Sequence, residues 1–293
     1  MKLLVVGANG QVGTELCLLE PNDCQIIGLG REKLDITNAE QVAAVIVEQQ
    51  PDFIVNASAY TAVDKAEEEI EMAYAVNHNG PLNLARSCHA LNIPLIHIST
   101  DYVFDGTSCR PYTEDDTTQP INIYGRSKLS GEVAVRESCP QHIILRSSWV
   151  FGRFGNNFVK TMLRLGQQRN ELSVVNDQQG CPSAAYDIAE AIIKICQALA
   201  LKDNQNAPWG TYHFSGTPAT NWYLFAHAIF SAAAKLGGRV PSIMPVSSSE
   251  YPTPAKRPHY TVLNCRKIER VFGIQPPGWQ AALDRVVAAC INH

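Results

Sequence analysis

The chain has 293 residues, of which 45% are hydrophobic and 18% are charged, and its net charge is −4 at pH 7. This composition is typical of a globular protein with a large buried core. The small negative charge excludes the basic surface that nucleic-acid-binding proteins need. The chain also has no lysine-rich run of the kind that binds an anionic membrane surface.

Targeting and metal-binding signals are also missing from the pattern. No apolar run approaches membrane-spanning length, and the first residues lead directly into a strand pattern, so we expect a cytoplasmic protein that contacts no membrane. The nine cysteines are scattered without a C-x-x-C spacing, and the eight histidines are dispersed. They predict buried thiols in a reducing compartment and no metal site built from His and Cys.

Residues 2–6 form a short apolar run, which is typical of a buried parallel strand. The run ends in Gly7-Ala8-Asn9-Gly10-Gln11-Val12-Gly13, and residues 14–19 are expected to be helical. In such a turn glycines let the backbone approach a pyrophosphate, and the helix N-terminus offers free N–H groups. The spacing departs from G-x-G-x-x-G, and a purely structural turn is the alternative. The residues predicted to bind a dinucleotide are Gly7, Gly10, Gln11, Val12 and Gly13.

Residues 25–29 predict a second strand, and the residues after it bear on the cofactor preference. An Asp or Glu at this strand end typically accepts a hydrogen bond from the ribose of NAD. Arg31 comes first here, and a guanidinium suits a 2′-phosphate, so we expect NADPH, with Glu32 leaving NADH as an alternative. Asp35 is a candidate contact for the adenine, or else a plain turn carboxylate, and Ile36 is assigned to the cofactor site with it.

A helix is expected up to residue 49, and residues 52–56 predict a third strand. Small residues in the loop after this strand would let the backbone approach a flat cofactor face. Ala59, Tyr60 and Thr61 are therefore assigned to the cofactor site.

Two helices are expected next. Residues 64–71 predict a charged helix with a solvated face, and residues 72–91 predict a long helix that contains Asn77. Asn77 is either exposed or holds a neighbouring backbone carbonyl, and the sequence does not separate these alternatives.

Residues 94–98 predict a strand that ends in Ser99 and Thr100. In a doubly wound sheet, ligands bind at the carboxyl ends of the strands. Thr100 is therefore a candidate polar group of the site. The alternative is that its hydroxyl caps its own turn.

Tyr124 opens a helix that is expected to extend to about residue 138, and Lys128 follows one turn later on the same face. The cation would lower the pKa of the phenol from its usual value of about 10 toward working pH. A phenol tuned in this way can exchange a proton with an alkoxide or an alcohol. The spacing alone is a weak signal, and the alternative is a half-buried Tyr beside a solvated Lys.

The repeated strand–helix pattern predicts an α/β fold, namely a Rossmann-like doubly wound parallel sheet with a smaller C-terminal α+β substrate-binding domain. Residues 212–214 are expected to add a last strand to the sheet, and the proline-rich residues 251–258 are expected to be a pinned loop. The expected domains are an NADP(H)-binding domain of residues 1–152 with about 184–216, and a substrate domain of about 153–183 and 217–293.

Four further motifs accompany these residues. They are Ala62-Val63-Asp64-Lys65-Ala66-Glu67, Ser99-Thr100-Asp101-Tyr102-Val103-Phe104, Gly155-Asn156-Asn157-Phe158 and Tyr251-Pro252-Thr253-Pro254-Ala255-Lys256-Arg257-Pro258. With the glycine turn and Tyr-x-x-x-Lys, the chain resembles an extended short-chain dehydrogenase/reductase. The four motifs are similar to those of the dTDP-4-dehydrorhamnose reductase family, and the resemblance covers nearly the whole chain.

The resemblance implies reduction of the C4 keto group of dTDP-4-dehydro-L-rhamnose to give dTDP-L-rhamnose, a precursor of cell-surface polysaccharide. It implies that Tyr124 gives a proton to the alkoxide and that Lys128 lowers the pKa of Tyr124 and binds the nicotinamide ribose. It also implies that Thr100 orients the carbonyl oxygen.

The same resemblance assigns the substrate site. Asp101 and Trp149 would line the sugar pocket, and Asn157 and Arg257 would hold the nucleotide diphosphate. A planar guanidinium grips phosphate oxygens well. The alternatives are an exposed loop arginine for Arg257 and a core residue for Trp149.

Some members of the family form a dimer bridged by Mg²⁺ through glutamates. Glu15 matches the first of these residues, but the position aligned with the second carries Tyr186, and the C-terminal end has no matching Glu. We therefore expect no bound Mg²⁺, and a monomer or a weak homodimer.

Two alternative functions remain open from the sequence. One is a non-catalytic NADP-binding regulatory subunit, similar to that of methionine adenosyltransferase, which shares the fold. The presence of Thr100, Tyr124 and Lys128 together with the Arg257 loop favours an enzyme over this alternative. The other is a reductase of another nucleotide-linked 4-keto sugar, which the sequence separates poorly.

Overall fold

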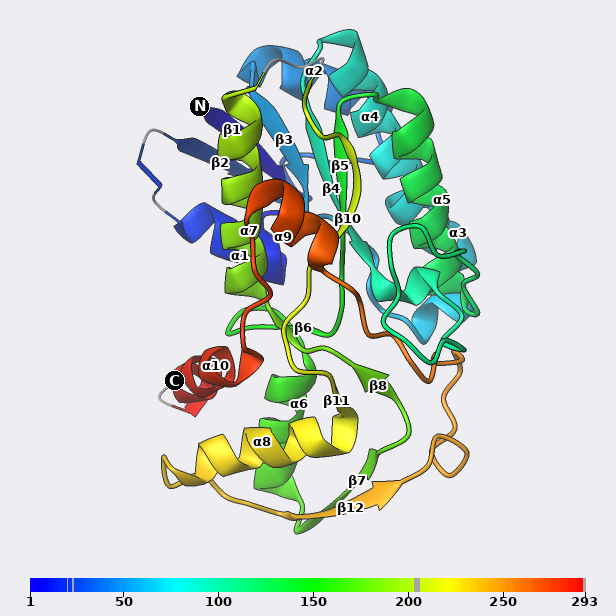
Figure 1. Ribbon diagram of the computed structural model, residues 1–293, viewed down its shortest axis with the longest axis vertical. Helices are drawn as coiled ribbons and strands as arrows, with labels where there is room; N and C mark the ends of the chain where they lie inside the picture. Colours follow the sequence, from blue (N-terminus) through cyan, green and yellow to red (C-terminus); the bar gives the residue numbers. More distant parts are fainter. Residues whose placement is uncertain (20, 23, 203–205, 292–293) are drawn as a thin grey trace.

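The computed structural model describes residues 1–19, 21–22, 24–202 and 206–291. A six-stranded sheet with the strand order β10-β5-β4-β3-β1-β2 fills one half of the molecule (Figure 1). Its strands are β1 (Lys2–Val6), β2 (Gln25–Leu29), β3 (Phe53–Asn56), β4 (Leu95–Thr100), β5 (His142–Ser147) and β10 (Gly210–His213). All five pairings are parallel. The predicted α/β fold with a Rossmann-like doubly wound sheet is confirmed, and the expected last strand is β10.

Helices cover both faces of the sheet because alternate strand residues point to opposite sides. One face packs on α1 (Gln11–Leu18), α7 (Ala185–Ala200) and α9 (Arg266–Phe272). The other face packs on α2 (Ala39–Gln49), α4 (Gly80–Ala90) and α5 (Ile123–Ser138). In β1, for example, Leu3 and Val5 belong to the first cluster of buried side chains, and Leu4 and Val6 belong to the second.

A separate apolar cluster lies beyond the carboxyl ends of the strands, in the lower part of Figure 1. Its helices are α6 (Phe158–Gln168), α8 (Trp222–Ala234) and α10 (Trp279–Ile291), and its parallel strand pair is β7 (Glu171–Val175) with β12 (Ser242–Val246). Short pairs join β6 (Val150–Phe151) to β9 (Ser183–Ala184) and β8 (Gln179–Gly180) to β11 (Thr220–Asn221). The division into two domains stays a prediction.

The segment between β3 and β4 differs from the two helices expected there. Only Lys65–Glu67 form a short 3₁₀ helix, and α3 (Ile70–Tyr74) begins after the non-helical backbone of Glu69. A π-helical turn, Ala75–Asn79, joins α3 to α4. Pro81 explains this turn, because a proline lacks an N–H group and its ring clashes with the carbonyl four residues earlier.

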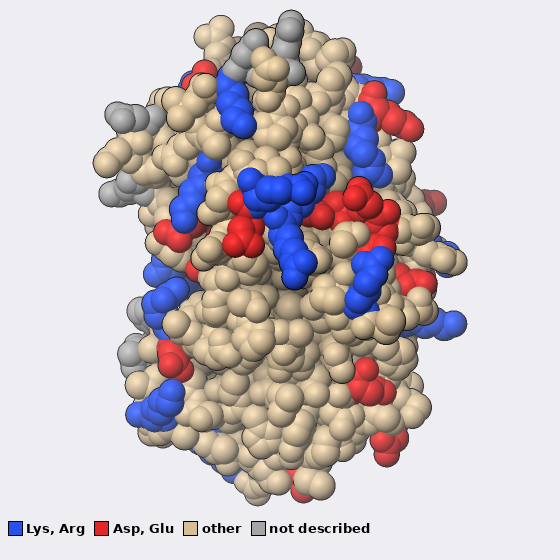
Figure 2. Space-filling model, in the orientation of Figure 1, with Lys and Arg blue, Asp and Glu red and all other residues tan. Residues whose placement is uncertain are grey.

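The structure also contains elements that the sequence did not indicate, namely α9, β12 and the short pairs. α9 returns to the sheet after the loop of residues 251–258 and packs beside α7 and β10 (Figure 1). None of the described helices is long and apolar enough to cross a membrane. On the face drawn in Figure 2, positive and negative side chains are intermixed near the middle, so this face has no extended patch of one sign.

Candidate active site

The glycine turn joins β1 to α1, as predicted. Gly7 has a φ of +81°, which favours glycine, and Gly10 stands directly before the first residue of α1. A Cβ atom at Gly13 would lie 2.2 Å from the carbonyl oxygen of Gly7. The turn therefore needs glycine at positions 7 and 13. It leaves the N-terminus of α1 at the carboxyl end of β1, where a dinucleotide would bind.

We expect Gly13→Ala to weaken NADPH binding strongly and to lower the melting temperature, because the added methyl group collides with backbone rather than with a flexible side chain. Titration of NADPH fluorescence and thermal melting would measure the two effects. The matched control is Gly278→Ala, since its φ is not positive and a Cβ atom there would meet only ordinary contacts, at 3.6 Å and 4.0 Å. Tight NADPH binding by Gly13→Ala would contradict the assignment of this turn.

The predicted adenosine contacts lie after β2. Arg31 and Glu32 are exposed, and Glu32 accepts a hydrogen bond of 3.1 Å from the side chain of Asn9 in the glycine turn. Asp35 accepts hydrogen bonds from the backbone and the hydroxyl of Thr37, which lower the pKa of Asp35. Asp35 is thus the turn carboxylate that was one alternative, and its contact with adenine stays a prediction.

Asn77 is a residue whose place sequence reasoning left open. It is buried in the π-helical turn, and its side chain bonds both the N–H and the C=O of Tyr60 at 2.8 and 3.1 Å. It also donates to the hydroxyl of Ser127 on α5 at 3.0 Å. Asn77 therefore fixes the predicted cofactor loop, which contains Ala59 and Thr61, against the helix that carries Tyr124.

Tyr124 and Thr100 lie together, as predicted. The side chain of Asn122 caps α5 and so places Tyr124 in the first turn of that helix, at the carboxyl end of β4, where Thr100 lies. Tyr124 is half-buried, and burial raises its pKa to about 12, although the hydroxyl of Thr100 within hydrogen-bonding reach opposes that shift. The pKa of the phenol is thus raised rather than lowered, contrary to the expectation from the Lys128 charge.

Lys128 is buried one turn beyond Tyr124, with only 2% of its surface exposed. Its ammonium group donates a hydrogen bond of 2.7 Å to the carbonyl oxygen of Ile98 in β4. Burial lowers the pKa of Lys128 to about 8, while the charge of Glu132 opposes this shift. An ammonium group has three donors, so two remain for a ligand.

Asp101 follows Thr100 and is 2% exposed. One of its oxygens accepts a hydrogen bond of 3.0 Å from the Thr100 hydroxyl. Burial raises the pKa of Asp101 to about 7, although the nearby hydroxyl groups of Thr261 and Thr100 oppose the shift. This carboxyl group can therefore change its charge near neutral pH.

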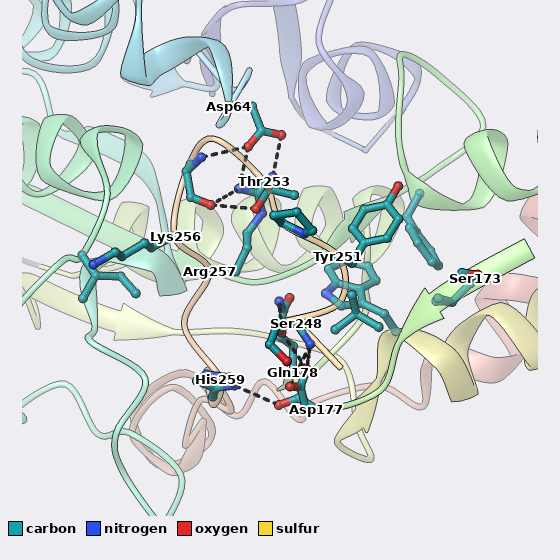
Figure 3. Close-up of a pocket in the computed structure, with 18 of the residues that line it drawn as sticks. Asp64, Ser173, Asp177, Gln178, Ser248, Tyr251, Thr253, Lys256, Arg257 and His259 are labelled. Carbon is teal, nitrogen blue, oxygen red and sulfur yellow. Dashed lines mark hydrogen bonds and ion pairs between the residues drawn. The ribbon is translucent and has the colours of Figure 1, made fainter. Parts of the chain in front are cut away.

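A cavity of about 890 Å³ opens beside these residues, between the sheet and the lower cluster. Tyr102 lines it and packs edge-on against Tyr124, with ring centroids 5.7 Å apart. Figure 3 shows side chains from the loop of residues 248–259 and from residues 173–178 around the cavity. The size suits a nucleotide-linked sugar rather than a small ketone.

Arg257 lies in this cavity, where it was predicted. Its guanidinium makes a two-bond ion pair with Asp64, at 2.9 and 2.8 Å, and also donates to the carbonyl oxygen of Ala255 (Figure 3). Asp64 accepts the N–H of Ala255 as well. The pair therefore pins the proline-rich loop to the segment after β3. Sequence reasoning missed Asp64 as a cavity residue because it predicted a solvated helix there.

The other two predicted substrate residues lie further from the cavity wall. Trp149 stacks on Trp222, with centroids 3.5 Å apart, and Trp222 lines the cavity. Asn157 caps α6 with its oxygen, and its amide donates to Gln11 and to the carbonyl oxygen of Gly152. Because the polar atoms of Asn157 are used within the protein, its contact with a diphosphate stays a prediction.

The implied Mg²⁺ site does not fit the residues present. Glu15 lines a second cavity, of about 620 Å³, but both of its carboxylate oxygens accept hydrogen bonds from Arg153 at 3.2 Å. Glu190 lines the same cavity and accepts a hydrogen bond from Tyr186. Within the described residues, no group of three or more His, Cys, Asp or Glu side chains is arranged to hold a metal.

The dinucleotide turn and the Tyr–Lys pair meet at one edge of a doubly wound sheet, which defines a nicotinamide-dependent oxidoreductase of the short-chain dehydrogenase type. The family model described as "RmlD substrate binding domain" matches residues 1–291. A dTDP-4-dehydrorhamnose reductase of Sinorhizobium fredii is 45% identical over 291 residues, which are 99% of this chain and 98% of the relative.

Two solved structures are similar over the whole fold. A dTDP-4-dehydrorhamnose reductase of Clostridium acetobutylicum has a TM-score of 0.91 at 37% identity, with 98% of this chain and 99% of that chain covered. The enzyme of Bacillus anthracis, solved in complex with NADP, has a TM-score of 0.89 at 39% identity and 98% coverage of each chain. The chain belongs to the dTDP-4-dehydrorhamnose reductase family, so the family predicted from the motifs is confirmed.

Proposed function

We propose that the protein reduces the C4 keto group of dTDP-4-dehydro-L-rhamnose with NADPH to give dTDP-L-rhamnose. The observation that carries this proposal is that Thr100, Tyr124 and Lys128 come together beside a cavity in a chain that matches the reductase family over residues 1–291. Relatives along the full length bear the name of this reductase, which supports the substrate.

When bound, NADPH would supply a hydride to C4 of the sugar. Tyr124 gives its phenolic proton to the alkoxide that forms, and its raised pKa of about 12 keeps that proton in place at neutral pH until it is needed. Thr100 orients the carbonyl oxygen toward the phenol. Lys128 holds the nicotinamide ribose with its remaining donors, and its ammonium charge is present below about pH 8.

The substrate extends from Tyr124 into the larger cavity. Asp101 and Trp149 are proposed to border the sugar, and Arg257 is proposed to bind the diphosphate by sharing or exchanging its bonds to Asp64. Tyr102 lines the cavity and packs edge-on against Tyr124, so it is proposed to border the sugar beside the phenol.

NADPH is the proposed cofactor, and a similar structure solved with NADP supports it. We expect Arg31→Ala to lower kcat/KM for NADPH by about 10-fold and to leave that for NADH nearly unchanged, because the guanidinium contacts only the 2′-phosphate. Steady-state kinetics with both cofactors would measure the ratio. Lys33→Ala, which changes the charge of an exposed residue nearby, is the control. If Arg31→Ala keeps the wild-type ratio of kcat/KM for NADPH to kcat/KM for NADH, Arg31 does not belong to the cofactor site.

The test of the function is NADPH oxidation followed with dTDP-4-dehydrorhamnose and, in parallel, with a UDP-linked 4-keto sugar. We expect turnover with the dTDP-linked substrate and a much lower kcat/KM with the other. A preference for the UDP-linked sugar would favour a related reductase. NADPH binding without turnover of either sugar would favour a regulatory subunit instead.

We further propose a monomer or weak homodimer in the cytoplasm. All nine cysteines lie within the described residues and are free, which suits a reducing compartment. The pairing of Glu15 with Arg153, which balances the charge that a bridging metal would need, supports a state that does not depend on Mg²⁺.

A further inference from the structure

A buried ion pair lies beneath the candidate site and takes no direct part in the proposed reaction. Glu132 follows Lys128 by one turn of α5 and is fully buried, and Arg146 on β5 is 3% exposed. The two side chains form a two-bond pair, with Nε to Oε1 at 2.8 Å and Nη2 to Oε2 at 2.7 Å. Burial alone would raise the pKa of Glu132. The charge and the hydrogen bonds of Arg146 outweigh burial and lower this pKa to about 2.

Two further bonds tie Glu132 to its surroundings. The Ser99 hydroxyl donates to Oε1 at 2.6 Å, and Arg136, one turn later on α5, donates to Oε2 at 3.1 Å. Ser99 and Arg146 are register partners on the adjacent strands β4 and β5, so Glu132 joins the helix to both strands. Every lone-pair direction of this carboxylate is used, which fixes it in one orientation.

The stretch of β4 that Glu132 holds is the stretch that holds the site. Ser99 stands between Ile98, whose carbonyl oxygen accepts the hydrogen bond of Lys128, and Thr100. A shift of Glu132 would therefore move α5 relative to both groups. Displacements of about 1 Å at such positions cost roughly 10²-fold in rate.

Glu132 also provides charge for Lys128. On α5, Glu132 is the charged group that acts on this ammonium, and Tyr124, one turn before Lys128, carries a neutral phenol at neutral pH. His97 faces the ammonium from β4. Burial, and after it the charge of Lys128, lowers the pKa of His97 well below the usual range, so this imidazole is neutral. The charge of Arg146 on β5 is balanced by its pairing with Glu132. Glu132 is the group that favours the charged form of Lys128 against burial.

We propose that Glu132 is a positioning residue of the reductase, which fixes α5 on β4 and β5 through Ser99 and Arg146 and supplies the counter-charge of Lys128. This inference rests on the proposed roles of Tyr124 and Lys128. Stability does not by itself account for the pair, because replacing a buried ion pair with well-packed uncharged residues is often neutral or stabilising.

The test compares Glu132→Gln, the double variant Glu132→Gln/Arg146→Met, and Glu132→Asp in the full-length protein with NADPH and dTDP-4-dehydrorhamnose. The double variant removes both charges and leaves neither Glu132 nor Arg146 as an unpaired buried charge, so we expect it to fold even if the single variant is unstable. We expect the double variant to lose about 10- to 100-fold in kcat, with KM for NADPH changed far less. We also expect the basic limb of its kcat–pH profile to move down by about one unit, because Lys128 loses its counter-charge.

Glu132→Asp keeps the charge but shortens the side chain, so we expect kcat to fall while the basic limb stays near its wild-type position. Asp284→Asn, which breaks the exposed pair of Lys235 and Asp284, is the control and should change neither quantity. A double variant that melts like the wild type and keeps the wild-type kcat and pH profile would overturn the inference. Tyr124→Phe is measured alongside. If that variant stays active, the proposed site itself fails. If it is inactive while the double variant keeps the wild-type kcat, only the role of Glu132 fails.

Discussion

Replacing Tyr124 with Phe is expected to lower kcat by about 10²- to 10⁴-fold, because the variant keeps the ring but loses the proton that the alkoxide takes. The phenol lies beside Thr100 and Tyr102 at the edge of the cavity, so the substitution leaves the packing intact. NADPH oxidation with dTDP-4-dehydrorhamnose would give kcat and KM, and fluorescence titration would show unchanged NADPH binding.

Tyr186→Phe is the matched control for this prediction. The hydroxyl of Tyr186 bonds Glu190 on α7, beside the second cavity, and it lines no part of the larger one. We expect wild-type kinetics from this variant. Near-wild-type kcat in Tyr124→Phe would show that another group protonates the sugar.

Replacing Arg257 with Ala is expected to raise KM for the nucleotide sugar by about 10- to 100-fold, with a smaller effect on kcat. The physical reason is the loss of the charge-assisted bonds that Arg257 is proposed to make to the diphosphate. In the free protein this guanidinium pairs with Asp64 instead. Arg257→Lys keeps the charge without the planar fork and should give an intermediate KM. Initial rates at varied substrate concentration would measure all three proteins.

Arg110→Ala is the matched control for Arg257. Arg110 also makes a two-bond pair with an aspartate, Asp116, but it is 60% exposed and does not line the larger cavity. We expect its removal to leave KM unchanged. A wild-type KM in Arg257→Ala would mean that the diphosphate binds elsewhere.

Local patterns predicted the sheet and the placement of Tyr124 and Lys128 on one helix, because each depends on neighbours in the sequence. Apolar runs that end in glycine or in hydroxyl residues mark the strands, and the four-residue spacing of Tyr124 and Lys128 marks one helix face. β10 was also found from its short apolar run, although it joins the sheet far from the other strands in sequence.

What the sequence did not show depends on contacts between distant segments. Asp64 meets Arg257 across 193 positions, and Glu132 meets Arg146 from a helix to a strand. No local period marks such pairs. The raised pKa of Tyr124 was missed for the same reason, since burial, which outweighs other influences here, follows from packing rather than from spacing.

The measurement that tests the central claim most directly is transfer of deuterium from NADPH labelled at the transferable nicotinamide position. The wild-type protein would be incubated with dTDP-4-dehydrorhamnose and each of the two stereospecifically labelled cofactors, and the product would be examined by NMR and mass spectrometry. We predict one deuterium at C4 of dTDP-L-rhamnose with one labelled cofactor and none with the other. Absence of deuterium at C4 with both cofactors would contradict hydride reduction of this sugar.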